Sequence, residues 1–386
     1  MKEKFLRELA DIQTGPFGSQ LHKEDYVADG TPIVTVEHLG NKMFSEQNLP
    51  RVSNTDKNRL KKYVLKQGDI VFSRVGSVDR CSYVDQKHDG WMFSGRCLRV
   101  RPTSEIDSEY LYYYFCLEET KQFVRNIAVG ATMPSINTKL LGEVVVTFPE
   151  LEQQKRISGI LSAIDSKIEV NQKINDNLEQ QAAALFSNLY NRSNTEVRYT
   201  DLIQILGGGT PKTGETAYWN GNIAFFTPKD VGTPYTFITE KTITEEGLSH
   251  CNSRLYPVNT VFVTARGTVG KVGLSGVPMA MNQSCYALVG KETHQLLVYF
   301  YTLKAVDRLK HKASGAVFDA ITTRDFDSEQ IMKLSDDDAK AFLCVAEPMF
   351  QEILNNSIEN LRLSTLRDFL LPKLMSGEID VSSVQL

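Results

Sequence analysis

Two short segments of the sequence place a basic side chain and small hydroxyl groups beside a glycine. Residues 73–77 read Ser-Arg-Val-Gly-Ser, and residues 264–268 read Thr-Ala-Arg-Gly-Thr, each directly after an apolar run. Arginine can donate two hydrogen bonds to guanine, and serine or threonine can contact a phosphate or a base edge. The residue types in these segments therefore predict contacts with nucleic acid.

Eight residues in and near these segments are the candidate contacts. We expect the basic residues to contact bases or phosphates and the hydroxyl residues to assist them. The candidates are Arg74, Arg80, Ser73 and Ser77 for the first segment, and Arg266, Lys271, Thr268 and Lys229 for the second. The alternative, which the sequence leaves open, is that these arginines and lysines form surface salt bridges. Two glycine-rich loops, residues 14–19 and 207–212, could bind phosphate through backbone N–H groups, but a plain tight turn is the favoured explanation.

No arrangement of residues typical of an enzyme accompanies these candidates. The sequence contains no GxxxxGK(S/T) phosphate-binding loop, no GxSxG, no HExxH and no cluster of histidine and cysteine ligands. The Asn-Pro-Pro-aromatic signature of amino-methyltransferases is also absent. The sequence therefore favours a protein without catalysis, and we expect no metal or cofactor in this chain. A nucleotide-binding enzyme that uses residues 207–210 is the least favoured hypothesis.

The composition is that of a folded chain in a reducing compartment. Of the 386 residues, 41% are hydrophobic, which is enough to form buried cores and excludes a largely disordered chain. Length alone predicts two or three domains. No apolar run reaches the ~18 residues of a membrane span, and the polar N-terminus is not a secretory signal. The six cysteines are widely separated, as expected of free thiols in the cytoplasm.

The chain contains two copies of one domain. Short β patterns at 31–36 and 70–73 return at 222–227 and 261–264. An aromatic-rich helical pattern follows in each copy, and we expect its aromatic side chains in the core. At spacings that drift from 191 to 185 residues, the matched pairs are Gly76 and Gly267, Val78 and Val269, Cys97 and Cys285, and Gly130 and Gly315. The drift indicates small insertions and deletions in the loops.

A long helix follows each copy. From residue 157 to 189, seam positions recur at alternating steps of four and three, and the same pattern returns 185 residues later, from 342 to 374. This spacing is typical of a coiled coil. Pro348 either kinks the second helix or marks its beginning, and Pro372 predicts a break near its end.

Both seams carry a pair of asparagines, Asn171 with Asn175 and Asn356 with Asn360. Antiparallel packing would place Asn171 opposite Asn360 and Asn175 opposite Asn356. Parallel packing would also match asparagine with asparagine, so the pattern leaves both directions open. A solvated flank of the helix is a further alternative.

The net charge of −4 is distributed unevenly. Residues 1–150 are neutral and residues 191–335 carry +2, whereas residues 336–386 carry −5. The overall acidity therefore does not exclude DNA binding by the two domains. The near-neutral charge of these domains predicts that the isolated chain binds DNA weakly.

In this order, and duplicated, the motifs resemble the specificity subunit of type I restriction–modification systems over essentially the whole chain. The segments that carry the resemblance are residues 15–19, 25–26, 68–78, 152–157, 265–271, 282–285 and 366–379. The last of these is the most specific, since it reads like the C-terminal signature of that family. One departure is the start of the second helix, which has Asp336-Asp337-Asp338 where the first has Gln-Gln-Lys-Arg.

The resemblance implies an α+β fold with two similar α/β target-recognition domains, separated by two long helices packed as a pseudo-twofold symmetric antiparallel coiled coil. The expected parts are a first domain at 1–149, a first spacer helix at 150–191, a second domain at 192–335, and a second spacer helix with a tail at 336–386. Each domain would read one half of a split, asymmetric site in double-stranded DNA, and the helices would set the gap between the halves.

The implied partners are two methylation subunits docked on the helices, and restriction subunits bound through them, without a membrane. S-adenosylmethionine, ATP and Mg²⁺ would belong to those partners. The second hypothesis is a two-headed protein scaffold without sequence-specific DNA binding.

Overall fold

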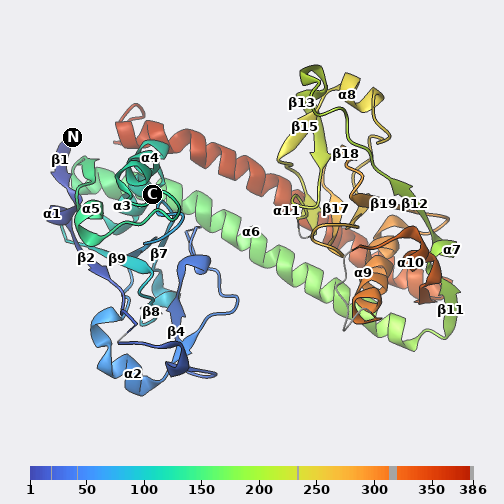
Figure 1. The fold of residues 1–386 in the computed structure, drawn as a ribbon, viewed down its shortest axis with the longest axis horizontal. Coiled ribbons are helices and arrows are strands. Elements are labelled where there is room, and N and C mark those ends of the chain that lie inside the picture. Colours follow the sequence, from blue (N-terminus) through green and yellow to red (C-terminus); the bar gives the residue numbers. More distant parts are fainter. Residues whose placement is uncertain (19, 41, 233, 313–319, 383–386) are drawn as a thin grey trace. The chain divides into compact units, whose positions relative to one another are not determined.

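The computed structural model describes residues 1–18, 20–40, 42–232, 234–312 and 320–382, so Ser19 and Gly315 lie outside the described residues. The chain divides into two compact units (Figure 1). Unit 1 is Met1–Glu169 with Asn360–Leu386, and unit 2 is Val170–Glu359. Among the described residues, no helix combines the length and the apolar character needed to cross a membrane.

The described residues of unit 1 form three sheets and several helices. Its strands are β1 (Lys2–Phe5), β2 (Ala10–Thr14), β3 (Tyr26–Val27), β4 (Thr31–Val34), β5 (Arg51–Val52), β6 (Ile70–Ser73), β7 (Cys81–Tyr83), β8 (Met92–Phe93), β9 (Cys97–Pro102) and β10 (Val145–Phe148). Its helices are α1 (Leu6–Leu9), α2 (Asn54–Arg59), α3 (Ser108–Cys116), α4 (Glu118–Ile127), α5 (Thr138–Gly142) and the first half of α6 (Leu151–Arg192). One four-stranded sheet has the order β2-β9-β6-β7 and is antiparallel, and the other has the order β3-β5-β4-β8 with β4 and β8 parallel. Strands β1 and β10 form a two-stranded antiparallel sheet.

Unit 2 repeats this plan. Its strands are β11 (Thr195–Arg198), β12 (Ile203–Gly207), β13 (Trp219–Phe226), β14 (Tyr235–Thr236), β15 (Lys241–Ile243), β16 (Val261–Thr264), β17 (Val272–Ser275), β18 (Met279–Met281), β19 (Cys285–Gly290) and β20 (Gln330–Lys333). Its helices are α7 (Tyr199–Leu202), α8 (Glu245–Ser249), α9 (Gln295–Lys312), α10 (Thr323–Ser328) and the first half of α11 (Asp336–Ser376). The sheet β12-β19-β16-β17-β14 corresponds to β2-β9-β6-β7, with β14 added at one edge.

Strand β6 is buried on both faces of its sheet. Successive side chains of a strand point to opposite faces, so Ile70 and Phe72 lie in the core around α3 whereas Val71 lies in the core of the sheet β3-β5-β4-β8. Phe72 meets Phe115 of α3 edge-to-face, with ring centroids 4.7 Å apart. The aromatic residues of α3 and α9 are mostly buried, which confirms that they form core.

Each unit contains parts of both long helices, packed side by side. Every seam position that the four-and-three spacing predicts in α6 and α11 is buried or half-buried. Helix α11 runs without interruption from Asp336 through Pro348 and Pro372, so Pro348 does not mark its beginning and Pro372 does not end it. Asn171 is fully buried and Asn356 is 6% exposed, so the solvated-flank alternative is wrong for these two residues.

The contacts within each unit run in opposite directions along the two helices. In unit 2, Asn171 Nδ2 donates to Glu359 Oε2 at 2.7 Å, and Asn356 Nδ2 donates to Asn175 Oδ1 at 3.0 Å. Toward the C-terminus of α6, Phe186 contacts Phe342, which lies earlier in α11. Partners along α11 thus move toward its N-terminus as α6 advances, and the Asn175–Asn356 hydrogen bond is one of the two pairs that the antiparallel alternative predicts.

In unit 1, Asp165 joins the two helices to the domain. Its Oδ1 accepts a hydrogen bond from Arg367 Nη1 at 2.8 Å, and its Oδ2 accepts one from Tyr113 OH at 2.6 Å. We expect Asp165→Ala to lower the free energy of unfolding by ~2–3 kcal/mol, because two partly buried donors lose their acceptor. Asp368→Ala removes a carboxylate that also pairs with Arg367 but is 65% exposed, so it should cost less than ~1 kcal/mol. Equal losses in urea denaturation would contradict the structural role given to Asp165.

Candidate nucleic-acid interface

The candidate contacts of unit 1 lie on loops at one end of the sheet β2-β9-β6-β7. Strands β2 and β6 end there, and the antiparallel strands β7 and β9 begin there. The loop after β2 packs against the loop before β9: Gly15 N donates to Cys97 O at 3.2 Å. Segments far apart in the sequence therefore form one surface.

The turn after β6 is stabilised by a backbone hydrogen bond to Pro134 and by the side chain of Ser73. Gly76 has a φ of +75°, a conformation that favours glycine, and its N–H donates to Pro134 O at 2.9 Å. Ser73 is 2% exposed, and its Oγ donates to Val75 O at 2.8 Å. Its hydroxyl therefore stabilises the turn, and we remove Ser73 from the candidate contacts.

Arg74 is half-buried in the corner between the two loops. Its Nη1 donates to Gly95 O at 3.1 Å, and its guanidinium carbon lies 5.0 Å from the centroid of the Phe17 ring. Phe17 is 51% exposed. Phe17 lies in the glycine-rich loop at 14–19, but its pairing with Arg74 was not predicted, because nothing in the spacing of residues 17 and 74 shows that the two loops meet.

Ser77 and Arg80 are exposed on the same turn. The Arg80 guanidinium lies over Gly40, where an added Cβ would approach Nη2 to 2.6 Å. Within the described residues Arg80 has no ion pair, and neither has Arg266. For these two arginines the salt-bridge alternative therefore has no support among the described residues.

Unit 2 presents the corresponding turn after β16. Gly267 has a φ of +80°, and Arg266, Thr268 and Lys271 are all exposed. Thr268 Oγ1 donates to Pro228 O at 3.0 Å, which ties the turn to the neighbouring loop and leaves the hydroxyl oxygen able to accept. Lys229 Nζ lies 3.5 Å from Glu240 Oε2, so this lysine does form the surface ion pair that the alternative predicts.

The two leading arginines do not occupy equivalent positions. The backbone of Arg74 makes hydrogen bonds of 2.8 and 3.0 Å with residues 96 and 136, and the backbone of Ala265 makes bonds of 2.8 and 2.9 Å with residues 284 and 321. Ala265 is thus the counterpart of Arg74, and Arg266 is the counterpart of Val75. The two domains share a turn but carry the guanidinium one residue apart.

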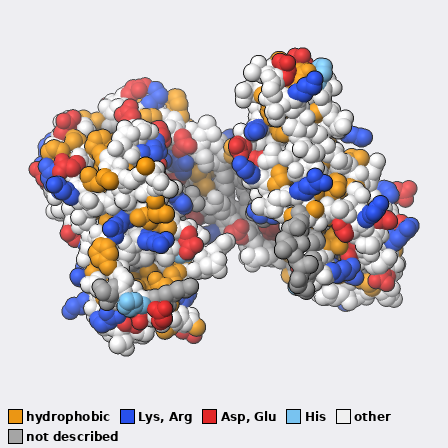
Figure 2. Space-filling model, in the orientation of Figure 1, with side chains coloured by type: hydrophobic (Ala, Val, Ile, Leu, Met, Phe, Trp, Pro, Cys, Tyr) orange, Lys and Arg blue, Asp and Glu red, His pale blue; other side chains and the backbone are white. Residues whose placement is uncertain are grey.

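The cysteines matched in the sequence repeat lie in the cores near these loops. Burial raises the pKa of the Cys97 and Cys285 thiols to about 12, so these matched cysteines are neutral core residues. The described residues contain no group of three or more His, Cys, Asp or Glu side chains placed to hold a metal ion. Figure 2 shows basic and acidic side chains interspersed on the visible face of each unit.

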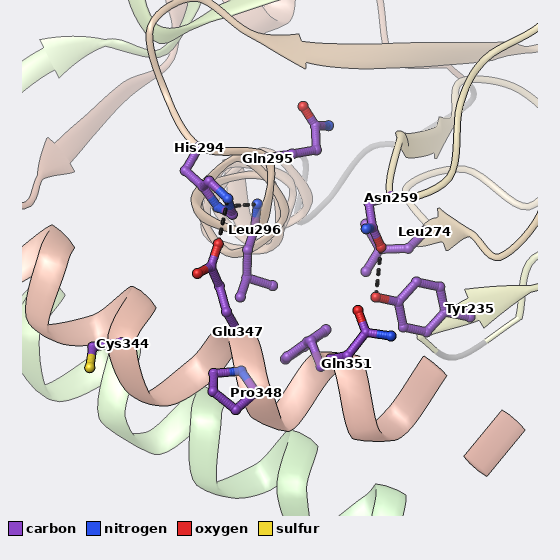
Figure 3. Close-up of a pocket in the computed structure, with 11 residues that line it drawn as sticks. Tyr235, Asn259, Leu274, His294, Gln295, Leu296, Cys344, Glu347, Pro348 and Gln351 are labelled. Carbon is purple, nitrogen blue, oxygen red and sulfur yellow. Dashed lines mark hydrogen bonds and ion pairs between the residues drawn. The ribbon is translucent and has the colours of Figure 1, made fainter. Parts of the chain in front are cut away.

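Unit 2 also has a cavity of about 460 Å³ between α9, α11, β14 and β17 (Figure 3). On one side Tyr235 OH donates to Asn259 Oδ1 at 2.8 Å, and on the other His294 Nε2 lies 2.6 Å from Glu347 Oε1. Asn259 precedes β16, whereas the basic turn follows that strand. The cavity therefore lies at the other end of the β16–β17 hairpin and is not part of the candidate interface.

The duplicated domain matches a known protein family. The family model for the type I restriction modification DNA specificity domain matches residues 1–180 and 191–333. The chain belongs to this family.

Individual relatives agree with the family match. The HindI specificity subunit of a type I restriction enzyme from Haemophilus influenzae is 24% identical, over 82% of this chain and 88% of its own length. The MjaIX specificity subunit from Methanocaldococcus jannaschii is also 24% identical, over 74% of this chain and 72% of its own. The crystal structure of the S subunit of a type I restriction–modification system from M. genitalium has a TM-score of 0.59 at 16% identity, covering 97% of this chain and 95% of the other. This last likeness concerns the fold alone.

Proposed function

We propose that this chain is the non-catalytic subunit that recognises the DNA sequence in a type I restriction–modification complex. The observation that carries the proposal is the duplicated turn, with exposed Arg80 in one family domain and exposed Arg266 and Lys271 in the other. A guanidinium and an amine on glycine turns at a sheet end can enter a groove and contact bases and phosphates. Two such surfaces suit a bipartite, asymmetric site.

The long helices act as the spacer between the two recognition domains. The proposed parts are residues 1–149 and 192–335 for recognition, and 150–191 with 336–386 for an antiparallel coiled coil of pseudo-twofold symmetry. The hydrogen bonds Asn175–Asn356 in unit 2 and Asp165–Arg367 in unit 1 support this pairing. Buried asparagines fix the register of such helices at some cost in stability.

Two methylation subunits dock on this chain, and restriction subunits join through them. The chain itself binds no cofactor. S-adenosylmethionine, ATP and Mg²⁺ are bound by the partner subunits. The complex works in the cytoplasm, where the host DNA is. Since residues 1–150 are neutral and residues 191–335 carry only +2, basic surfaces on the partners supply much of the attraction to phosphate.

An electrophoretic mobility shift assay tests the proposal. The chain is mixed with DNA fragments that contain or lack the site methylated in the host, with and without the methylation subunits. We expect sequence-dependent retardation when the methylation subunits are present, and weak binding without them. No sequence-dependent retardation under either condition would favour a protein scaffold instead.

Replacing Arg266 and replacing Lys271 should affect DNA binding in different ways. Arg266→Ala is expected to cost ~1–3 kcal/mol and to relax the preference at one position of the second half-site, because a base-reading arginine discriminates locally. Lys271→Ala should weaken binding to all sequences alike and reduce the slope of binding against salt by about one charge. Titrations of single-position site variants in the assembled complex measure both effects. An Arg266→Ala complex with unchanged motif and affinity would exclude Arg266 as a contact.

A further inference from the structure

We infer that one corner of the recognition surface reads different bases in the two domains: guanine through Arg74 in the first and adenine through Gln283 in the second. The inference rests on the proposed function and assigns base preferences to its two half-sites. It concerns the place where the loop after β2 or β12 meets the loop before β9 or β19.

The backbone makes this corner equivalent in the two units. Thr14 pairs with Leu98 in the first sheet, and Gly207 pairs with Tyr286 in the second. The next residue in each loop is a glycine pressed against a carbonyl oxygen of the facing loop. A Cβ on Gly15 would lie 2.1 Å from residue 94 O, and a Cβ on Gly208 would lie 2.2 Å from residue 282 O.

Two residues after these glycines, the side chains at the corner differ in chemical type between the two units. In unit 1 the corner holds the aromatic ring of Phe17, the backbone of Gly95 and the guanidinium of Arg74. In unit 2 the counterparts of Phe17 and Gly95 are Thr210 and Gln283, and the counterpart of Arg74 is alanine. Thr210 and Gln283 are exposed, and Thr210 Oγ1 donates a hydrogen bond to Gln283 Oε1.

Each side chain is held before any ligand arrives. The stack on Phe17 and the bond to Gly95 O restrict Arg74 to one orientation, which reduces the entropy lost on binding. The Thr210 hydroxyl holds the Gln283 carbonyl oxygen and thereby orients the amide. The Gln283 NH₂ remains available as a donor, and its oxygen has a second lone pair.

The donor and acceptor patterns select the bases. A guanidinium offers donors only, which match the two acceptors O6 and N7 of guanine in the major groove. A carboxamide offers one donor and one acceptor, which match N7 and the N6 amino group of adenine. The corner of the first domain therefore selects guanine and the corner of the second selects adenine.

The test selects binding sequences from randomised DNA duplexes with the chain assembled with its methylation subunits. The variants are Arg74→Gln and Gln283→Arg. We expect Arg74→Gln to lose its guanine preference at one position of one half-site, by about 5- to 150-fold. Gln283→Arg should replace adenine by guanine at one position of the other half-site. In each variant the remaining half-site should be unchanged.

Arg96→Gln is the matched control, since Arg96 is exposed beside the same corner and its replacement removes the same charge. This variant should bind all DNA sequences more weakly by the same factor and should select the same motif as the wild type. If the wild-type complex selects a bipartite motif but both corner variants select that same motif, the inference is wrong while the proposed function stands. If the wild type selects no bipartite motif, the proposed function itself fails.

Discussion

Gly15→Ala is expected to abolish recognition of the first half-site and leave recognition of the second intact. An added Cβ would lie 2.1 Å from Ser94 O and 2.5 Å from the carbonyl carbon. Backbone on both sides prevents a small adjustment, so the loop after β2 must separate from the loop before β9. Overpacking of this kind costs ~1–3 kcal/mol or more, and the separation displaces Phe17 and Arg74 together.

Gly18→Ala provides the control for this variant. A Cβ on Gly18 meets nothing within 4 Å, so this neighbouring substitution should leave both halves of the motif unchanged. The measurement is the affinity of the assembled complex for duplexes in which one half-site at a time is scrambled. Normal discrimination at the first half-site by the Gly15→Ala complex would show that the packed corner has no role in recognition.

Insertion of one heptad at matched points of α6 and α11 should end recognition of the native DNA site. A heptad preserves the seam of the helix pair and adds ~10 Å at about 1.5 Å per residue. That length corresponds to about three base pairs at about 3.4 Å each. The altered complex should therefore select a longer gap, or fail to assemble where the longer spacer does not fit its partners.

A two-residue insertion at the same points is the control, because at about 100° per residue it turns the following seam positions to the opposite side of each helix and should prevent stable pairing. The gap is measured by sequencing the bases that each complex methylates. Full methylation at the native gap by the heptad variant would contradict the spacer role of the helices.

Much of the architecture follows from local patterns. The four-and-three spacing predicts the long helices, because a helix presents such positions on one face, and those positions are indeed kept from solvent in α6 and α11. The matched glycines of the repeat mark positions with positive φ, Gly76 and Gly267. Pro348 does not mark the beginning of the second helix, because α11 begins at Asp336, twelve residues earlier.

The site was predicted less completely, because it depends on contacts between distant segments. The residue types indicated Arg74, yet its stack on Phe17 joins positions 57 residues apart. The sequence does not distinguish Ser73 from its neighbour Ser77. Ser73 ends a buried strand, and its hydroxyl donates a hydrogen bond to Val75 O within the turn. Gln283 lies in a segment that carries the family resemblance, but only the strand registers of the two domains identify it as the counterpart of Gly95 at the Arg74 corner.

The central claim is that two domains of one chain read two halves of one DNA site across a fixed gap. The most direct measurement is sequencing of the modified bases in the DNA of a host that expresses this chain with its methylation subunits, against a host that lacks the chain. We expect methylation at a single asymmetric motif in two parts with a constant number of unspecified bases between them. Methylation at a continuous motif, or an identical pattern in both hosts, would contradict the account.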